Sequence, residues 1–260
     1  MIFKEKLTLN DIKKVVLLNH LFYFYSMKKE KIKRYAVLTI LFFLPVAFLL
    51  MLYPSTHNYE PLDIVHNDIS DISLSEVIKL QDHITVLAFF GNKPIEKATA
   101  ASNLKELMYD KFKGFKKFQI VVLGLEGSED EYSKLNKEIA KYEDLKFWHY
   151  IYLSESDIRE IYRNLKTTEE LDDNYSTDKV FIIDKDRNQR GRLDDRKKKE
   201  IEANKPITQL YAYDCIEVAE IKNKMSEDMR ILFTEYRQKR KGEFQDSDSR
   251  RANDLKQIDE

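Results

Sequence analysis

Residues 84–112 constrain the fold most, because they predict a buried strand, a short loop and a helix in direct succession. The strand is predicted by the apolar run ITVLAFF, which is rich in β-branched and aromatic residues. The helix is predicted over residues 98–112, where apolar side chains recur mostly at spacings of three and four. In the loop between them, Asn92 is suited to cap the helix and Pro94 to occupy its first turn, where a missing N–H is harmless.

The rest of the chain continues this alternation of strands and helices. Strands are predicted over residues 118–123, 147–153 and 180–184, and amphipathic helices over residues 131–142 and 154–165. Such an order predicts an α/β fold with a central sheet and flanking helices.

The residues Asp184, Asp186 and Asn188 have the spacing that opens a calcium-binding loop. A loop of that kind needs Gly at its sixth position and Glu at its twelfth, where this chain has Gln189 and Asp195. We therefore interpret the segment as the turn of a hairpin.

A long helix is predicted over residues 215–241, with Asp214 as its cap. Its apolar residues form one stripe, which consists of Val218, Ile221, Met225, Met229, Leu232, Phe233 and Tyr236. A stripe of this width predicts that the helix packs on the domain.

Two segments carry motifs, namely FFGNKPIEKA at residues 89–98, followed by Asn103 and Leu104, and STDKVFIIDKDRNQRG at residues 176–191. They resemble motifs of the SCO/SenC copper chaperones of the thioredoxin-like superfamily. The family's first pattern is roughly FF-T-x-C-P-x-x-C-P followed by N-L, and its second is H-S-x-x-x-F-L-I-D-x-D-G-x-x-x-G. The resemblance implies a thioredoxin-like fold over residues 73–241.

The three copper ligands of that family are replaced in this chain. Lys93 and Lys97 stand where the two cysteines are expected, and no histidine lies at residues 174–177. The degenerate site positions are therefore Lys93, Pro94, Lys97 and Ser176. We expect no cofactor, no bound metal and no enzymatic activity.

The nineteen residues 35–53 carry no charge and predict a membrane-spanning helix about 28 Å long. On the N-terminal side, residues 28–34 hold five Lys or Arg and one Glu, whereas no Lys or Arg occurs from Pro54 until Lys79. This asymmetry predicts a cytoplasmic N-terminus and a large domain on the outside. A cleaved signal peptide is the alternative, but no small-x-small cleavage site follows the apolar run.

Five segments are expected in order. They are a cytoplasmic segment (1–34), a transmembrane signal-anchor (35–53), a tether (54–72), the thioredoxin-like domain (73–241) and a disordered charged tail (242–260). Met1 and Met27 remain equal alternatives as the start, because the basic and then apolar residues after Met27 also form a proper leader.

The composition limits the kinds of partner and of reactive or metal site that we expect in this chain. A net charge of −1 gives no electrostatic reason to expect a nucleic-acid partner. The single cysteine, Cys215, excludes an intramolecular disulfide and favours a structural role. The spacings of His57, His66 and His83 match no metal-ligand pattern, so we interpret them as solvated.

The leading hypothesis is a single-pass protein of the bacterial inner membrane, whose periplasmic domain acts as an interaction or assembly module. The resemblance implies an accessory role near a respiratory complex, and the expected partners are the bilayer and an envelope protein complex. The candidate docking residues are Asn92, Lys93, Glu96 and Lys97, with both lysines exposed. The alternative is a divergent copper chaperone or thiol protein that uses Cys215 and histidines.

Overall fold

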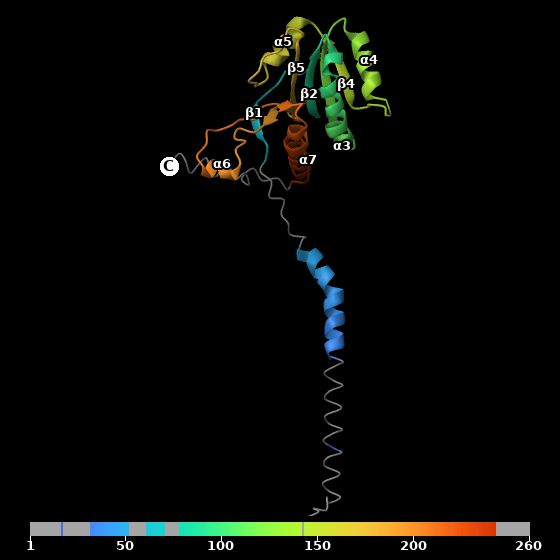
Figure 1. The fold of residues 1–260 in the computed structure, drawn as a ribbon, viewed down its shortest axis with the longest axis vertical. Helices are drawn as coiled ribbons and strands as arrows, with labels where there is room; N and C mark the ends of the chain where they lie inside the picture. Colours follow the sequence, from blue (N-terminus) through green and yellow to red (C-terminus); the bar gives the residue numbers. More distant parts are fainter. Residues whose placement is uncertain (1–16, 18–31, 52–60, 71–77, 142, 243–260) are drawn as a thin grey trace, which may run out of the picture. The chain divides into compact units, whose positions relative to one another are not determined.

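The computed structural model describes residue 17 and residues 32–51, 61–70, 78–141 and 143–242 (Figure 1). Two units make up the chain, residues 1–58 and 59–260. Several expectations fall outside the described residues. They concern the start at Met1 or Met27, most of the cytoplasmic segment, His57 and the tail from residue 243 onward.

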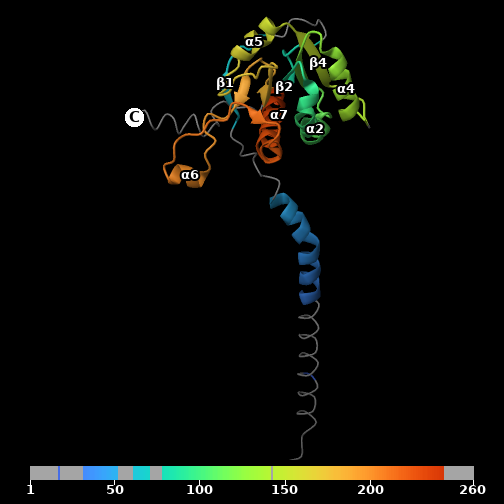
Figure 2. The same cartoon turned by 45° about the horizontal axis from the view of Figure 1, so that its top comes forward.

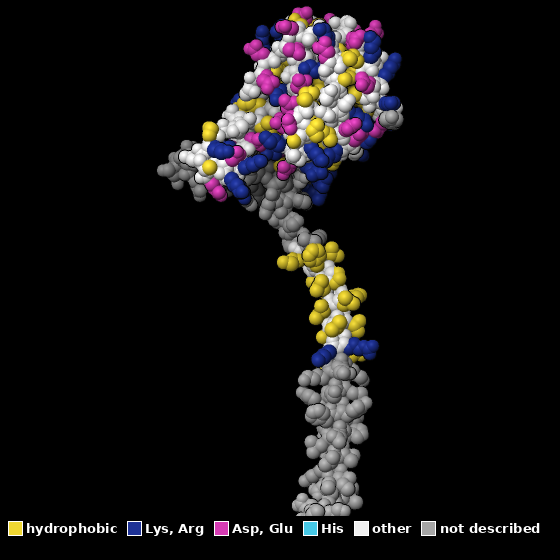
Figure 3. All heavy atoms as spheres, viewed as in Figure 1, with side chains coloured by type: hydrophobic (Ala, Val, Ile, Leu, Met, Phe, Trp, Pro, Cys, Tyr) yellow, Lys and Arg dark blue, Asp and Glu magenta, His cyan; other side chains and the backbone are white. Residues whose placement is uncertain are grey.

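The described part of the first unit contains a long apolar helix, Ile32–Met51, with a mean hydropathy of 2.1. Hydrophobic side chains cover its surface and none of it is buried (Figure 3). The described part of the helix includes Ile32, Lys33 and Arg34, which precede the predicted span. Its length and composition suit a membrane crossing, as they suit a signal sequence.

The second unit is built on a mixed sheet, in which the strands lie in the order β1-β6-β5-β2-β3-β4, with β7 paired to β5 (Figures 1 and 2). The strands are β1 (Asp63–His66), β2 (Ile84–Gly91), β3 (Phe118–Leu125), β4 (Trp148–Leu153), β5 (Ser176–Ile183), β6 (Gln189–Gly191) and β7 (Tyr213–Asp214). β2, β3 and β4 are parallel, whereas β5 runs antiparallel to β2.

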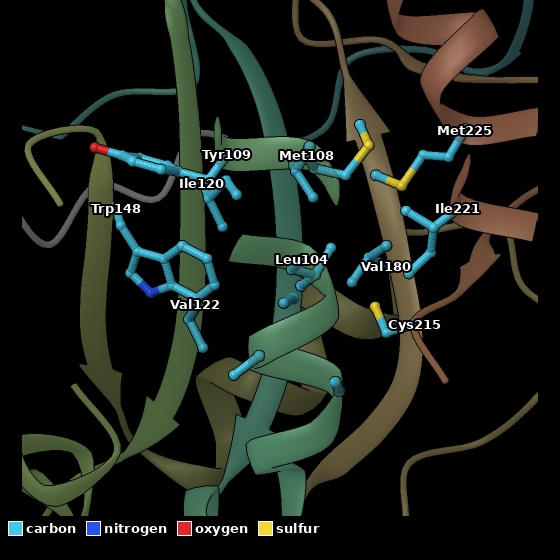
Figure 4. Packing of buried hydrophobic residues seen from close by; sticks show 14 of the residues in the cluster. Leu104, Met108, Tyr109, Ile120, Val122, Trp148, Val180, Cys215, Ile221 and Met225 are labelled. Carbon is cyan, nitrogen blue, oxygen red and sulfur yellow. The ribbon is translucent and has the colours of Figure 1, made fainter. Parts of the chain in front are cut away.

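Helices cover both faces of this sheet. The helical elements of this unit are a 3-10 turn (Pro94–Lys97), α2 (Ala98–Leu104), a π turn (Lys105–Tyr109), α3 (Asp110–Phe112), α4 (Glu129–Ile139), α5 (Glu155–Arg163), α6 (Lys198–Glu202), a second π turn (Glu220–Met225) and α7 (Ser226–Lys241). Of these, α6 buries no side chain and does not cover the sheet. α2, α3, α4 and α7 pack on one face, where Leu104, Leu135 and Leu232 are buried. Figure 4 shows Leu104 and Ile221 within this cluster. α5 packs on the other face through Ile158 and Tyr162.

The central strand β2 is buried along its whole length. Val86 and Phe90 belong to the first hydrophobic cluster, and Leu87 and Phe89 belong to the second. A parallel strand with helices on both sides has no polar face, so its sequence is continuously apolar. The predicted α/β fold with a central sheet and flanking helices is confirmed.

The segment expected to be a tether, residues 54–72, contains part of the folded domain. β1 pairs antiparallel with β6, and Leu62, Val65 and Ile69 are buried. The start expected at residue 73 is therefore corrected to include this edge strand. Four residues with charged neighbours give too short a pattern to predict a strand from sequence.

The helix predicted over residues 98–112 and the helix predicted over residues 215–241 differ from expectation in how they begin or continue. Asn92 does not cap the helix after β2, because Lys93 holds that position without a side-chain hydrogen bond. In the C-terminal helix, a π turn adds a residue to the turn and rotates the register. Val218, expected in the buried stripe, is 46% exposed. Asp214 accepts hydrogen bonds from the N–H groups of Ile216 and Glu217, as a cap does.

A buried arginine joins the β5–β6 hairpin to α7. Arg190 Nη1 lies 3.0 Å from Asp184 Oδ2, and its other terminal nitrogen pairs with Glu235. The Asp184 carboxylate also accepts hydrogen bonds from the N–H groups of Asp186 and Asn188, which confirms the predicted hairpin turn. All three charged side chains of the network are buried. Loss of Arg190 would therefore leave two buried carboxylates without a positive partner.

A second arginine, Arg192, joins the same hairpin to the start of α7. Its guanidinium makes several hydrogen bonds to Asp228, and Tyr213 donates another to that carboxylate at 2.7 Å. Burial raises the pKa of Asp228 despite these partners. The positive charge of Arg192 partly offsets the cost of burying the Asp228 carboxylate on α7.

We expect Arg190→Met to lower the free energy of unfolding by about 3–5 kcal/mol, because Asp184 and Glu235 would remain buried without a cation. Urea unfolding of the full chain in a mild detergent measures this change. The control, Arg230→Met on the exposed side of α7, should stay within about 0.5 kcal/mol. Equal midpoints for the two variants would contradict the role given to Arg190.

Candidate functional site

The candidate site is the loop 91–97 at the C-terminal end of β2. Gly91 has φ of +61°, and a Cβ there would lie 1.8 Å from the carbonyl oxygen of Asn174. The N–H of Asn92 donates to that same oxygen at 3.0 Å. Only glycine permits so close an approach, so the start of the loop is held against the segment that precedes β5.

A tyrosine from α4 supports the loop from inside. The hydroxyl of Tyr132 donates a hydrogen bond to the carbonyl of Gly91 at 2.9 Å. Burial raises the pKa of this hydroxyl far above its ordinary value, so it stays protonated and remains a donor. The loop is thus attached to both α4 and the segment before β5.

The tip of the loop is exposed. Lys93 and Glu96 are 56% and 61% exposed and form an ion pair of 3.6 Å. Pro94 between them is buried, whereas Ile95 is 40% exposed. Lys93 is therefore accessible, as expected, and Glu96 is accessible too. Ile95 adds an apolar group that the sequence analysis did not single out.

Lys97 corrects the expectation that both lysines are exposed. Its side chain is only 14% exposed, and its Nζ lies 3.0 Å from Asp178 and 3.9 Å from Asp172. The ammonium group faces the start of β5 and not the solvent. Lys97 therefore serves the junction between the loop and the sheet.

Ser176, the other degenerate site position, belongs to the same junction. Its Oγ donates to Asp172 at 2.6 Å, and its N–H donates to the second oxygen of that carboxylate at 2.8 Å. Because Asp172 also faces Lys97, the structure brings Lys97 and Ser176 together through a shared carboxylate. The sequence analysis missed Asp172 and Asp178. The acidic run before β5 is a signal for Asp172, whereas Asp178 lies within β5 and has no such local signal.

Cys215 lies next to this junction, but its environment does not favour a reactive thiolate. It is fully buried between β7 and the C-terminal helix, and its N–H donates to the Asp178 carbonyl at 2.8 Å. The side-chain amide of Asn103 donates to its carbonyl at 2.8 Å. Burial, then the charges of Asp214 and Asp178, raise the pKa of the thiol well above its usual value. A protonated, enclosed thiol is a poor nucleophile and a poor metal ligand.

The described histidines lie elsewhere. His66 is on β1, His149 is on β4, and His83 precedes β2 at the end opposite Gly91. Burial, then the nearby charge of His83, lower the pKa of His149. Within the described part of the chain, no three side chains of the metal-binding kinds gather.

The residues at the family's ligand positions do not fit a copper ion. Cu(I) selects soft thiolate and thioether ligands. Positions 93 and 97 carry ammonium groups, one of which is already paired with two carboxylates. The Ser176 hydroxyl is a hard oxygen that already donates to Asp172. No copper chemistry follows from this arrangement.

The topology places the site within a known fold. β2, which leads into the loop, has the following parallel strand β3 on one side and the antiparallel strand β5 on the other. A hairpin partner, β6, and a long helix complete the domain. The fold is thioredoxin-like.

Neither a protein-family model nor a curated protein sequence matches the chain. Several solved structures are similar, among them the following three. A SCO1/SenC family lipoprotein from Bacillus anthracis is 15% identical, with 59% of this chain and 83% of that chain covered, at a TM-score of 0.39. BsSco, a member of the Sco family of cytochrome c oxidase assembly proteins, is 12% identical, with 66% and 97% covered, at a TM-score of 0.41.

A putative protein disulfide isomerase from Bacteroides thetaiotaomicron is 11% identical, with 69% of this chain and 98% of that chain covered, at a TM-score of 0.39. SCO proteins, whose motifs the two segments resemble, are thus among the structures that are similar to this chain. At these identities the likeness concerns the fold alone.

We expect Cys215 in the native full chain to react with iodoacetamide only as fast as the domain opens, because the thiol is protonated and enclosed. Intact mass measured over time at pH 8 follows the reaction, since the chain has one cysteine. The same chain in urea should react completely and serves as the control. Rapid labelling of the folded chain would contradict this assignment.

Proposed function

We propose that the chain is a membrane-anchored interaction module of the bacterial envelope, without redox or copper chemistry, that holds a protein partner on the loop 91–97. The observation that carries this proposal is the opposite orientation of the two lysines. Lys97 is enclosed by Asp172 and Asp178, whereas Lys93 is exposed beside Ile95 and Glu96. Lys97 supports the fold, whereas Lys93, Ile95 and Glu96 are accessible to a partner.

The composition of the exposed tip defines the kind of partner. Lys93 offers a cation and Ile95 an apolar group, on a loop fixed by the backbone of Gly91. A fixed loop loses little conformational entropy on binding. The loop therefore suits a protein segment that carries acidic residues next to an apolar side chain.

The anchor in this proposal is the helix Ile32–Met51. Its bilayer-length apolar surface and the basic residues before it support a signal-anchor in the inner membrane, with the domain in the periplasm. BsSco is described as belonging to a family of cytochrome c oxidase assembly proteins. By this similarity of fold, we propose that the partner is a membrane complex of the respiratory type and that the role is assembly or accessory.

We expect Lys93→Glu and Ile95→Asp each to reduce the amount of partner recovered with the tagged full chain from solubilised membranes. The first change reverses the charge that meets an acidic segment, and the second removes the apolar contact. Quantitative mass spectrometry of the purified complex measures recovery. Both variants should keep their stability within about 0.5 kcal/mol, because the side chains are exposed.

Two matched variants control for these changes. Lys134 is exposed on α4 and paired with Glu131 three residues away, as Lys93 is paired with Glu96. Ile207 is an exposed isoleucine in another loop. Lys134→Glu and Ile207→Asp should leave recovery unchanged, and recovery unaffected by all four substitutions would show that the loop is only a remnant of a lost site.

A further inference from the structure

A basic hollow lies at the end of the sheet opposite the loop 91–97. It is formed by the turn before β3, the turn after β5 and the last turns of α7. Six of its eleven lining residues are basic, and one, Asp186, is acidic. The basic residues are Lys116, Lys117, Lys185, Arg237, Lys239 and Arg240.

The positive charge of this hollow is only slightly neutralised by the protein. Lys239 pairs with Glu235 at 2.8 Å, and Asp186 accepts a hydrogen bond from Tyr236 at 2.7 Å. Among the described residues, no carboxylate lies within ion-pair distance of the other five cations. Burial, then the positive charges of Lys117 and Arg240, lower the pKa of Lys185. The cations are thus close enough to repel one another.

The C-terminus of a helix accounts for only part of this charge. Lys239 and Arg240 stabilise the negative end of the α7 dipole, as cations in a last turn do. Lys116, Lys117 and Lys185 come from two turns outside α7, to which the dipole argument does not apply. Three separate segments therefore converge with the same sign of charge on one hollow.

The floor of the hollow is aromatic. The rings of Phe115 and Phe233 stack with their centroids 4.1 Å apart, and the ammonium of Lys185 lies 5.0 Å from the ring centre of Tyr236. Aromatic side chains with cations around them suit the interface of a membrane, where phosphates lie next to apolar chains. A ligand with an anionic head and an apolar body fits both parts.

The chain itself brings such ligands close. The described part of the apolar helix reaches Met51 and the described part of the domain begins at Pro61, so these two residues can be at most about 35 Å apart along the chain. If the helix is the anchor proposed above, on which this inference rests, the domain stays within about its own diameter of the bilayer. We propose that the basic hollow binds the phosphate headgroups of anionic phospholipids in that bilayer.

This contact would orient the loop. The N–H of Ile84 at the start of β2 donates to the carbonyl of Lys117 beside the hollow, whereas Gly91 ends the same strand. Eight residues of extended strand separate the two ends by about 23 Å. With the hollow on the lipid surface, the loop 91–97 faces away from the bilayer and toward a partner.

The test uses the full chain in nanodiscs and backbone hydrogen exchange measured by mass spectrometry. The discs contain phosphatidylcholine alone, phosphatidylcholine with phosphatidylglycerol, or phosphatidylcholine with inorganic phosphate in solution. Exchange in residues 114–117 and 236–241 should slow only in the discs with phosphatidylglycerol, and added salt should reverse the effect.

The variant K116Q/K117Q/R237Q/R240Q should reduce this slowing about tenfold or more, since each cation near an anionic surface contributes roughly a factor of five. A matched control, K137Q/R163Q/K198Q/R230Q, removes the same charge from exposed positions elsewhere and should retain the slowing. Equal slowing by inorganic phosphate, no slowing with phosphatidylglycerol, or equal loss in the control would overturn the proposal.

The anchor is tested separately by co-elution of the chain with discs of phosphatidylcholine alone. A chain that does not co-elute contradicts the proposed anchor and not the hollow. In that case, flotation of the chain with phosphatidylglycerol vesicles but not with phosphatidylcholine vesicles would still support the hollow. Flotation with neither would overturn it.

Discussion

The close approach of Gly91 to the backbone of Asn174 determines how the central strand meets the rest of the domain. It brings the end of β2 next to the start of β5, where Phe90 pairs with Ser176. Asp172 and Asp178 then lie within reach of Lys97, and their attraction for its ammonium group turns that side chain inward. The loop that follows Gly91 has little freedom left, so Lys93 and Ile95 are presented to solvent in one arrangement.

Some charged side chains of the domain form ion pairs inside the fold, whereas others gather on its surface. Beside the loop, Lys97 is matched by carboxylates, and under α7 the guanidinium of Arg190 is matched by Asp184 and Glu235. These pairs are enclosed and connect segments that are distant in sequence, so they specify how α7 and the hairpin close the domain. In the basic hollow, cations such as Lys116 and Arg237 gather without ion-pair partners among the described residues. Unmatched charge on a surface favours an external partner over internal stability.

The elements with strong local patterns could be predicted from the sequence. The segment that forms β2 is apolar along almost its whole length because helices cover both its faces. The helix predicted over residues 154–165 is present as α5, with Ser154 as its N-cap. The inward turn of Lys97 could not be predicted, because its partner Asp178 lies 81 residues away and only the fold brings them together. β1 was missed because an edge strand of four residues leaves no clear alternation. The π turns were missed because no local signal marks an extra residue in a helix.

The central proposal is that two of the expected ligand positions, Lys97 and Ser176, join the loop to the sheet, and that the chain binds no copper. Competition for Cu(I) between the purified full chain and a strong chelator tests it most directly. The chelator is predicted to keep all the copper, because Lys93 and Lys97 offer no soft ligand and the Cys215 thiol is enclosed. A Lys93→Cys/Lys97→Cys variant, which places two thiols on the same loop, is predicted to retain copper and shows that the assay detects such a site. Stoichiometric copper retained by the unsubstituted chain would contradict the account.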